Sequence, residues 1–262
     1  MILLESRNLK ALTGVRHAFL TRQGGVSEGP FATLSAGLRS GDDPDRVAEN
    51  RARVAQALGF SPDRLVTARQ VHGAECVIVG DHPWLPEAAP DADALATDRP
   101  GLLLGVLTAD CAPVLLADPA AGVVGAAHAG WKGALSGVLE RTVDAMLRFG
   151  ATRPGITAAI GPAIAQPSYE VGPEFEARFM AEDPAGAAAY FAPVPGSDRC
   201  LFDLKGYAAG RLRGAGVQRV ETLPHDTCAE EELFFSFRRA TRRAEERFGV
   251  QLSVIGLPPT QR

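Results

Sequence analysis

The segment at residues 102–133, LLLGVLTADCAPVLLADPAAGVVGAAHAGWKG, constrains the fold more than any other part of the chain. It contains three short apolar runs, at residues 102–107, 113–117 and 122–127, which are separated by Asp, Pro and Gly. Apolar runs of this length between turn residues are typical of strands that are buried on both faces. The links are too short for a crossover helix, so neighbouring runs are predicted to pair antiparallel.

Two residues of this segment carry chemistry that a buried strand does not need. Cys111 lies in the first turn, and His128 lies where the third run ends. Pairing of the strands across these turns would bring a thiol and an imidazole to one end of a sheet. The sequence GWKG at residues 130–133 then begins a predicted helix, and a glycine-rich turn with a lysine at that point favours an anion.

In the rest of the chain, predicted helices and strands are interspersed. Helices are predicted at residues 43–58, 133–150 and 204–212, and further strands at 15–20, 65–68, 76–79, 156–160, 217–223 and 250–257. Several links between strands are too short for βαβ units, so a mixed α+β fold is predicted rather than a doubly wound parallel sheet. The sequence has neither an internal repeat nor a low-complexity linker, which predicts a single domain over residues 1–262.

Composition and charge argue against several classes of protein. A net charge of −4 provides no basic surface for nucleic acid, and no apolar run has the length of a membrane span. The first residues, MILLESRNLK, lack the pattern of a secretion signal. Four cysteines lie far apart without a Cys-x-x-Cys pair, as in proteins of a reducing compartment. These features predict a cytoplasmic protein without nucleic-acid or membrane partners.

His72, in a turn between two predicted strands, supplies a second imidazole. Zinc binds thiolate and imidazole, and catalytic zinc sites use three protein ligands and leave a fourth position for water or substrate. Two other interpretations fit the same residues: a buried cysteine beside unrelated histidines, or Cys111 as a nucleophile with His128 as its base. Spacing alone favours the buried cysteine, because ligands scattered along a chain form no compact motif.

Two further residues are candidates for contacts with a substrate. Arg22 stands beside paired glycines in a loop whose backbone can approach a ligand closely, although a plain turn with an exposed arginine is the simpler interpretation. Tyr169 follows the predicted strand at 156–160, and packing and a pocket position are equally consistent with it.

Four motifs together resemble the YfiH-like laccase-domain family. They are QVHGAECV (70–77), DADALAT (91–97), TADCAPVLLAD (108–118) and AAHAGWKG (126–133). The resemblance continues through TRQGGVSEGPFATLS (21–35), GDDPDRVAENR (41–51) and FFSFRR (234–239), so it covers nearly the whole chain. Members of this family are variously described as polyphenol oxidases, purine nucleoside phosphorylases or peptidoglycan editing factors.

The resemblance implies two packed mixed β-sheets flanked by helices, and a Zn²⁺ ion held by His72, Cys111 and His128. It implies phosphorolysis of adenosine, inosine, guanosine and methylthioadenosine, and deamination of adenosine. Arg22 matches the arginine of the family's N-terminal Arg-x-Gly-Gly loop, and Lys132 stands where many members have arginine. Either side chain would hold phosphate, the lysine as a point charge rather than a bidentate fork.

Two further points concern the reaction. Asp110, adjacent to a predicted ligand, is the candidate for moving protons during deamination. Family members often follow FFSFRR with an Asp-Gly-x-Thr-Gly-Arg turn, but this chain has ATRRAEERFGVQ at residues 240–251. A substrate contact from that turn is therefore not carried over.

The oxidase description meets a physical objection. The chain has five histidines, and three of them lie outside the predicted zinc ligands, which is too few for a coupled copper cluster. No laccase activity and no copper cluster are therefore predicted. Two alternatives stay open: a cysteine hydrolase or peptidoglycan-precursor editing factor that uses a Cys111/His128 pair, and a non-catalytic module that holds zinc for structure.

Overall fold

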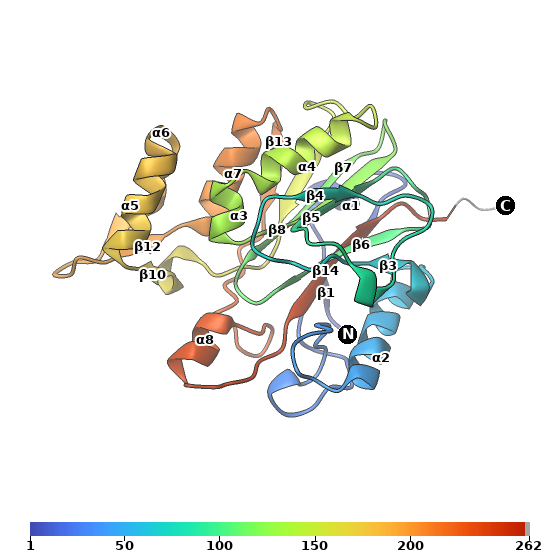
Figure 1. Ribbon diagram of the computed structural model, residues 1–262, viewed down its shortest axis with the longest axis horizontal. Helices are drawn as coiled ribbons and strands as arrows, with labels where there is room; N and C mark the ends of the chain where they lie inside the picture. The colour runs from blue at the N-terminus through green and yellow to red at the C-terminus, as the bar shows by residue number, and fades with distance from the viewer. Residues whose placement is uncertain (260–262) are drawn as a thin grey trace.

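The computed structural model describes residues 1–259, whose strands form three sheets (Figure 1). The strands are β1 (Leu3–Leu4), β2 (Arg16–Leu20), β3 (Leu65–Val66), β4 (Cys76–Ile78), β5 (Ala94–Thr97), β6 (Leu103–Thr108), β7 (Ala112–Asp118), β8 (Val123–Ala129), β9 (Thr157–Ile160), β10 (Glu170–Val171), β11 (Phe191–Pro193), β12 (Cys200–Phe202), β13 (Arg219–Thr222) and β14 (Gln251–Gly256). One sheet has the order β13-β9-β7-β8-β5-β4, the second β1-β2-β14-β6-β3, and the smallest β10-β12-β11.

The helices lie around these sheets, and most of them are short. They are α1 (Arg7–Lys10), α2 (Pro44–Ala57), α3 (Trp131–Leu135), α4 (Val138–Leu147), α5 (Pro173–Glu182), α6 (Pro184–Ala187), α7 (Leu204–Gly214) and α8 (Phe237–Arg242), with 3₁₀ turns at η1 (Gly29–Phe31), η2 (Pro62–Arg64), η3 (Pro86–Ala88), η4 (Gln166–Ser168) and η5 (Ala188–Tyr190). Within residues 1–259, none of the helices combines the length and the apolar character needed to cross a lipid bilayer.

The two large sheets pack face to face because their strands are apolar on both sides. On β7, Leu115 packs in the core between the sheets, whereas Val114 and Leu116 pack in the core beneath the helices. This alternation follows from the two-residue period of a strand. On the facing sheet, Phe19 of β2 and Ile255 of β14 fill the same inter-sheet core.

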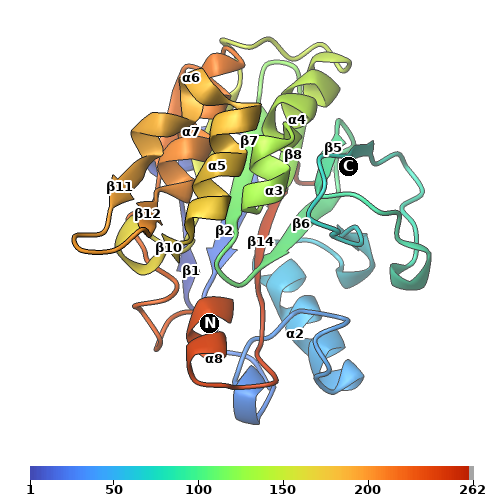
Figure 2. The ribbon, with the colours of Figure 1, turned by 60° about the vertical axis from the view of Figure 1, so that its left-hand side comes forward.

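Helices cover the outer face of each large sheet. Figure 2 shows α3, α4, α5 and α7 over the sheet that contains β7, while α2 lies against the other sheet at the opposite end of the molecule. Asp43 begins α2, as predicted, because its carboxylate accepts hydrogen bonds from the backbone N–H groups of Asp45 and Arg46. The predicted mixed α+β fold, with two packed sheets flanked by helices, is confirmed.

Two local predictions were wrong. The runs at 102–107 and 113–117 do not pair: β6 pairs with β14 and β3, whereas β7 pairs with β8 and β9 in the facing sheet. The short turn between β6 and β7 crosses from one sheet to the other. The helix predicted at 133–150 is two helices, because Gly137 adopts a φ of 93°, which interrupts the helix between α3 and α4.

Candidate metal centre and its cavity

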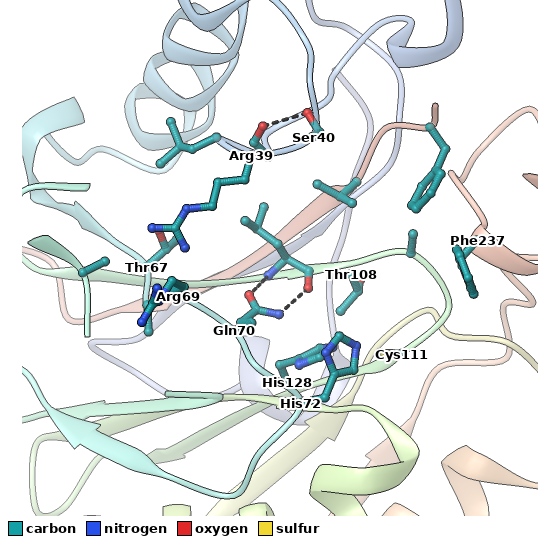
Figure 3. A pocket seen from close by; sticks show the side chains of 18 of the residues that line it. Arg39, Ser40, Thr67, Arg69, Gln70, His72, Thr108, Cys111, His128 and Phe237 are labelled. Atoms are coloured by element: carbon teal, nitrogen blue, oxygen red, sulfur yellow. Dashed lines mark hydrogen bonds between the residues drawn. The ribbon is translucent and has the colours of Figure 1, made fainter. Parts of the chain in front are cut away.

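Three side chains from distant parts of the sequence meet at one end of the two large sheets (Figure 3). His72 comes from the loop between β3 and β4, Cys111 from the β6–β7 turn, and His128 from the end of β8. Their potential ligand atoms all lie within 4.8 Å of one another, and the two imidazole rings stand nearly perpendicular, at 85°. A thiolate and two imidazoles are a donor set that zinc accepts, so these residues fit a metal ion of that kind.

Asp93 organises this cluster from beneath. Its buried carboxylate accepts a hydrogen bond from Nδ1 of His128 at 2.8 Å and from the backbone N–H groups of Val71, His72 and Gly73 at 2.7–3.1 Å. The bond to Nδ1 leaves Nε2 of His128 free to act as a ligand. Burial opposes the charge of Asp93, but the hydrogen bonds from His128 and the backbone hold the pKa of the carboxyl below its usual value. This role of Asp93 is not predictable from its position in the sequence.

The loop that carries His72 has an unusual backbone conformation. His72 has a φ of 59°, a value that non-glycine residues rarely adopt. In this conformation three successive N–H groups converge on the Asp93 carboxylate, which stabilises the turn. Gln70 ties the same loop to β6, because its amide both donates to and accepts from the backbone of Leu107.

Gly130 allows the backbone to lie directly against the cluster. A Cβ atom at this position would lie 3.0 Å from Sγ of Cys111 and 3.1 Å from Cδ2 of His72. Gly133 has a similar constraint, since its Cβ would lie 2.6 Å from the carbonyl oxygen of Gly73. The glycines of the GWKG sequence therefore serve close packing. Helix α3, which they begin, has only five residues.

Cys111 and His128 shift each other's pKa. Burial alone would raise the pKa of the Cys111 thiol, but the charge of His128 and hydrogen bonds to both histidines lower it to about 6. Burial likewise opposes a charged His128, but the Cys111 thiolate and Asp93 raise its pKa to about 9. Each group thus favours the charged form of the other, the thiolate of Cys111 and the imidazolium of His128. Cys76, which burial gives a pKa of about 12, stays a thiol.

Asp110 connects the cluster to the C-terminal part of the chain. Its carboxylate accepts hydrogen bonds from the hydroxyls of Thr227 and Ser236, at 2.6 and 2.9 Å, and from the backbone N–H of Arg238 at 2.6 Å. Burial raises the pKa of Asp110, and these three donors oppose that rise. The contacts hold the C-terminal segment against the turn that carries Cys111. The role in proton transfer stays a prediction.

A cavity of about 650 Å³ opens beside the cluster, within the roughly 300–1,000 Å³ typical of small-molecule sites. All three candidate ligands line it, whereas Asp110 does not. Its walls also include residues 37–40, 67–70, 107–109 and 246–248, together with Pro86, Ala89, Phe237 and Val250. The three candidate ligands therefore form the floor of the cavity, and residues from inside and outside the sequence motifs form its walls.

Three residues predicted to contact a substrate are not part of the lining of this cavity: Arg22, Lys132 and Tyr169. The Arg22 guanidinium donates to the carbonyl oxygens of Ala32 and Glu231 and lies 4.5 Å from the centre of the Phe235 ring. Lys132 is exposed and lies 5.5 Å from the centre of the Trp131 ring.

Tyr169 packs in a group of aromatic rings, with the Phe175 and Phe202 ring centroids at 6.0 and 5.9 Å. Burial, and to a lesser extent the charge of Cys111, raise the pKa of the Tyr169 phenol. Its role in substrate binding stays a prediction, as do those of Arg22 and Lys132.

Three arginines that the sequence analysis did not select line the cavity: Arg39, Arg69 and Arg247. Arg69 is paired with Asp91, while Arg39 and Arg247 are exposed. The divergent stretch 240–251 supplies Arg247, Phe248 and Val250 to the wall. The sequence contained one indication of these cavity residues, namely that residues 240–251 differ from the turn common in the family. A loop that differs next to a site changes what the site contacts.

The chain is similar to known proteins over most of its length. Residues 16–258 match the family model described as "Multi-copper polyphenol oxidoreductase laccase". The chain is 45% identical over 256 residues to a purine nucleoside phosphorylase of Deinococcus radiodurans, covering 98% of this chain and 93% of that protein. It is 40% identical over 226 residues to the purine nucleoside phosphorylase YfiH of Escherichia coli, covering 86% of this chain and 89% of that protein.

Solved structures share the fold over nearly the full length. The crystal structure of the Bacillus licheniformis hypothetical protein YfiH superposes with a TM-score of 0.86 at 34% identity, covering 93% of this chain and 92% of that one. YlmD from Geobacillus stearothermophilus has a TM-score of 0.85 at 34% identity, with coverage of 94% and 93%.

Proposed function

Because the chain belongs to the YfiH-like laccase-domain family, we propose that it is a zinc-dependent purine nucleoside phosphorylase whose site is the His72–Cys111–His128 cluster. The observation that carries the proposal is the convergence of these three side chains on the floor of a cavity large enough for a nucleoside. The proposed substrates are adenosine, inosine, guanosine and methylthioadenosine, each with phosphate, and the proposal includes deamination of adenosine. We further propose that residues 1–262 form a single cytoplasmic domain that acts on small molecules.

In phosphorolysis a phosphate oxygen attacks the anomeric carbon of the ribose as the purine leaves. A phosphate anion and a neutral nucleoside must be brought together in the right orientation, so positioning by the protein accounts for much of the rate. The exposed arginines of the cavity, Arg39 and Arg247, provide charge for phosphate in addition to the predicted Arg22 and Lys132. Guanidinium groups suit this role because they bind phosphate in a bidentate way.

His72, Cys111 and His128 would hold the zinc ion, which when bound supplies Lewis acidity to polarise a substrate group. The low pKa of Cys111 favours the deprotonated ligand that a metal requires. Asp93 keeps the imidazole of His128 in one tautomer and one orientation. The cavity walls exclude part of the bulk water, so the charges on its floor act in a medium of lower dielectric constant.

Zinc is proposed rather than a multi-copper centre, whatever the name of the family model. The other histidines are held in separate surroundings. His17 accepts a hydrogen bond from the backbone of Ser6, His225 pairs with Glu230, and His82 is exposed. A coupled copper cluster needs many imidazoles in one place.

The test combines metal analysis with an assay of inosine plus phosphate for release of ribose 1-phosphate. Purified protein is expected to contain close to one zinc per chain and to release ribose 1-phosphate, with adenosine also converted to inosine. Cys111→Ala should lose both metal and activity. Cys76→Ala is the matched control, because Cys76 lies outside the cavity lining. Retention of metal and activity by Cys111→Ala would contradict the proposal, as would turnover of a phenol in proportion to bound copper.

The close approach of Cys111 and His128, whose potential ligand atoms lie within 4.8 Å of each other, favours a second candidate, a cysteine hydrolase that acts on peptidoglycan precursors. The two candidates respond differently to a chelator. Phosphorolysis that depends on zinc should stop when the metal is removed and return when zinc is added. Hydrolysis by a thiol nucleophile should survive the chelator and be lost after alkylation of Cys111.

A further inference from the structure

Phe237 is an aromatic side chain that the fold leaves open to the cavity. It lines the cavity wall, and 55% of its surface is exposed, although it is one of the large apolar residues that a fold normally buries. An apolar ring exposed inside a concave site is typical of a surface that a ligand covers.

The ring is exposed but firmly attached. Its two neighbours in sequence, Ser236 and Arg238, both bind the Asp110 carboxylate, through the hydroxyl of Ser236 and the backbone N–H of Arg238. Asp110 precedes the candidate ligand Cys111, so one carboxylate sets the position of Phe237 relative to the cluster. Ser236 also caps the N-terminus of α8. On its other side the ring contacts Phe248, with centroids 5.5 Å apart.

The two ends of the cavity carry different kinds of side chain. In Figure 3, Phe237 lies on one side of the cluster, and the side chains of Arg39 and Arg69 lie on the other. An aromatic surface at one end and the exposed guanidinium of Arg39 at the other match the two reactants of nucleoside phosphorolysis, a flat purine and a phosphate. The sugar between them would then lie closest to the cluster.

From this geometry we infer that Phe237 stacks against the purine base of the substrate, with Phe248 from the divergent segment supporting the ring from behind. The inference rests on the proposed function and deepens it. Stacking is tolerant of the base, because every purine has an aromatic face. It therefore suits substrates that differ in the groups on the purine edge, as adenosine, inosine and guanosine do. Asp110 acts here as a positioning residue.

Two substitutions at residue 237 test the inference. Phe237→Leu keeps an apolar side chain but removes the aromatic face, and Phe237→Trp keeps the face. Phe237→Leu is expected to raise the KM for inosine by about five- to 150-fold, the range of a lost base stack, while leaving the KM for phosphate and the melting temperature unchanged. Phe237→Trp should stay near the wild-type values. Ile78→Ala, another partly exposed apolar residue, lies outside the cavity lining and is the control.

The outcomes separate this inference from the function on which it rests. If the wild type is active and Phe237→Leu retains its KM for inosine, the stacking role is wrong and the phosphorylase stands. If the wild type releases no ribose 1-phosphate, the proposed function fails, and equilibrium binding of inosine decides the role of the ring. Weaker binding by Phe237→Leu than by Phe237→Trp would then support stacking, and equal binding would refute it.

Discussion

Replacing Asp93 with asparagine would test how the candidate metal centre is held together. The Asp93 carboxylate accepts four hydrogen bonds: Oδ1 binds His72 N–H and His128 Nδ1, and Oδ2 binds the N–H groups of Val71 and Gly73. Asparagine has one oxygen, which can keep one of these pairs. Its NH₂ group would face the donors of the other pair.

The expected loss follows from that count. Two hydrogen bonds to a buried charged acceptor disappear, and at about 1–3 kcal/mol each the free energy of unfolding should fall by about 2–6 kcal/mol. If the NH₂ group faces His128, the imidazole must accept at Nδ1 and carry its proton on Nε2. That tautomer does not bind a metal through Nε2, so zinc affinity should fall by roughly 10- to 100-fold.

Urea unfolding of the metal-free protein measures the first effect, and competition with a chelator measures the second. Asp91→Asn is the matched control, since it makes the same change two residues away at an exposed carboxylate paired with Arg69. Such exposed pairs contribute about 0–1 kcal/mol. Equal losses of stability in the two variants would refute the reasoning. An unchanged zinc affinity in Asp93→Asn would show that the asparagine oxygen, and not its NH₂ group, faces His128.

Three further predictions concern other parts of the molecule. Gly130→Ala should reduce the free energy of zinc binding more than the free energy of unfolding, because its Cβ would lie 3.0 Å from the Cys111 sulfur. Chelator competition measures the first quantity and urea unfolding the second. His17 is buried and its pKa is lowered, chiefly by burial, from the ordinary 6.5, so the unfolded chain takes up a proton that the folded chain refuses. The free energy of unfolding of the wild type, measured with urea, should therefore decrease below about pH 6.5, by up to about 1.4 kcal/mol per pH unit. The free energy of unfolding of His17→Gln should decrease less steeply. The exposed control His82→Gln should show the same pH dependence as the wild type. Arg39→Met should raise the KM for phosphate about tenfold. An equal KM in Arg39→Met and wild type would exclude Arg39 and leave Arg22, Lys132 and Arg247, each tested by its own methionine variant.

Much of the fold was predictable because its signals are local. The strands β7 and β8 follow from short apolar runs between turn residues, and α2 follows from Asp43 and an apolar stripe. The pairing of β7 with β8 could be predicted as well, since a short link leaves few other partners. The partner of β6 could not, because a run that is apolar on both faces fits either sheet equally well.

Local sequence patterns were sufficient to predict the residue types of the site, the mixed fold and the motifs that identify the family. The surroundings of those residues depend on how the chain packs: Asp93 lies beneath His128, Asp110 binds Ser236 across 126 positions, and Phe237 lies on the wall of the cavity. The difference comes from the distance along the chain over which each signal acts. Periodicity and turn chemistry act between neighbours along the chain, whereas hydrogen bonds and cavity walls depend on which distant segments the packed cores bring together.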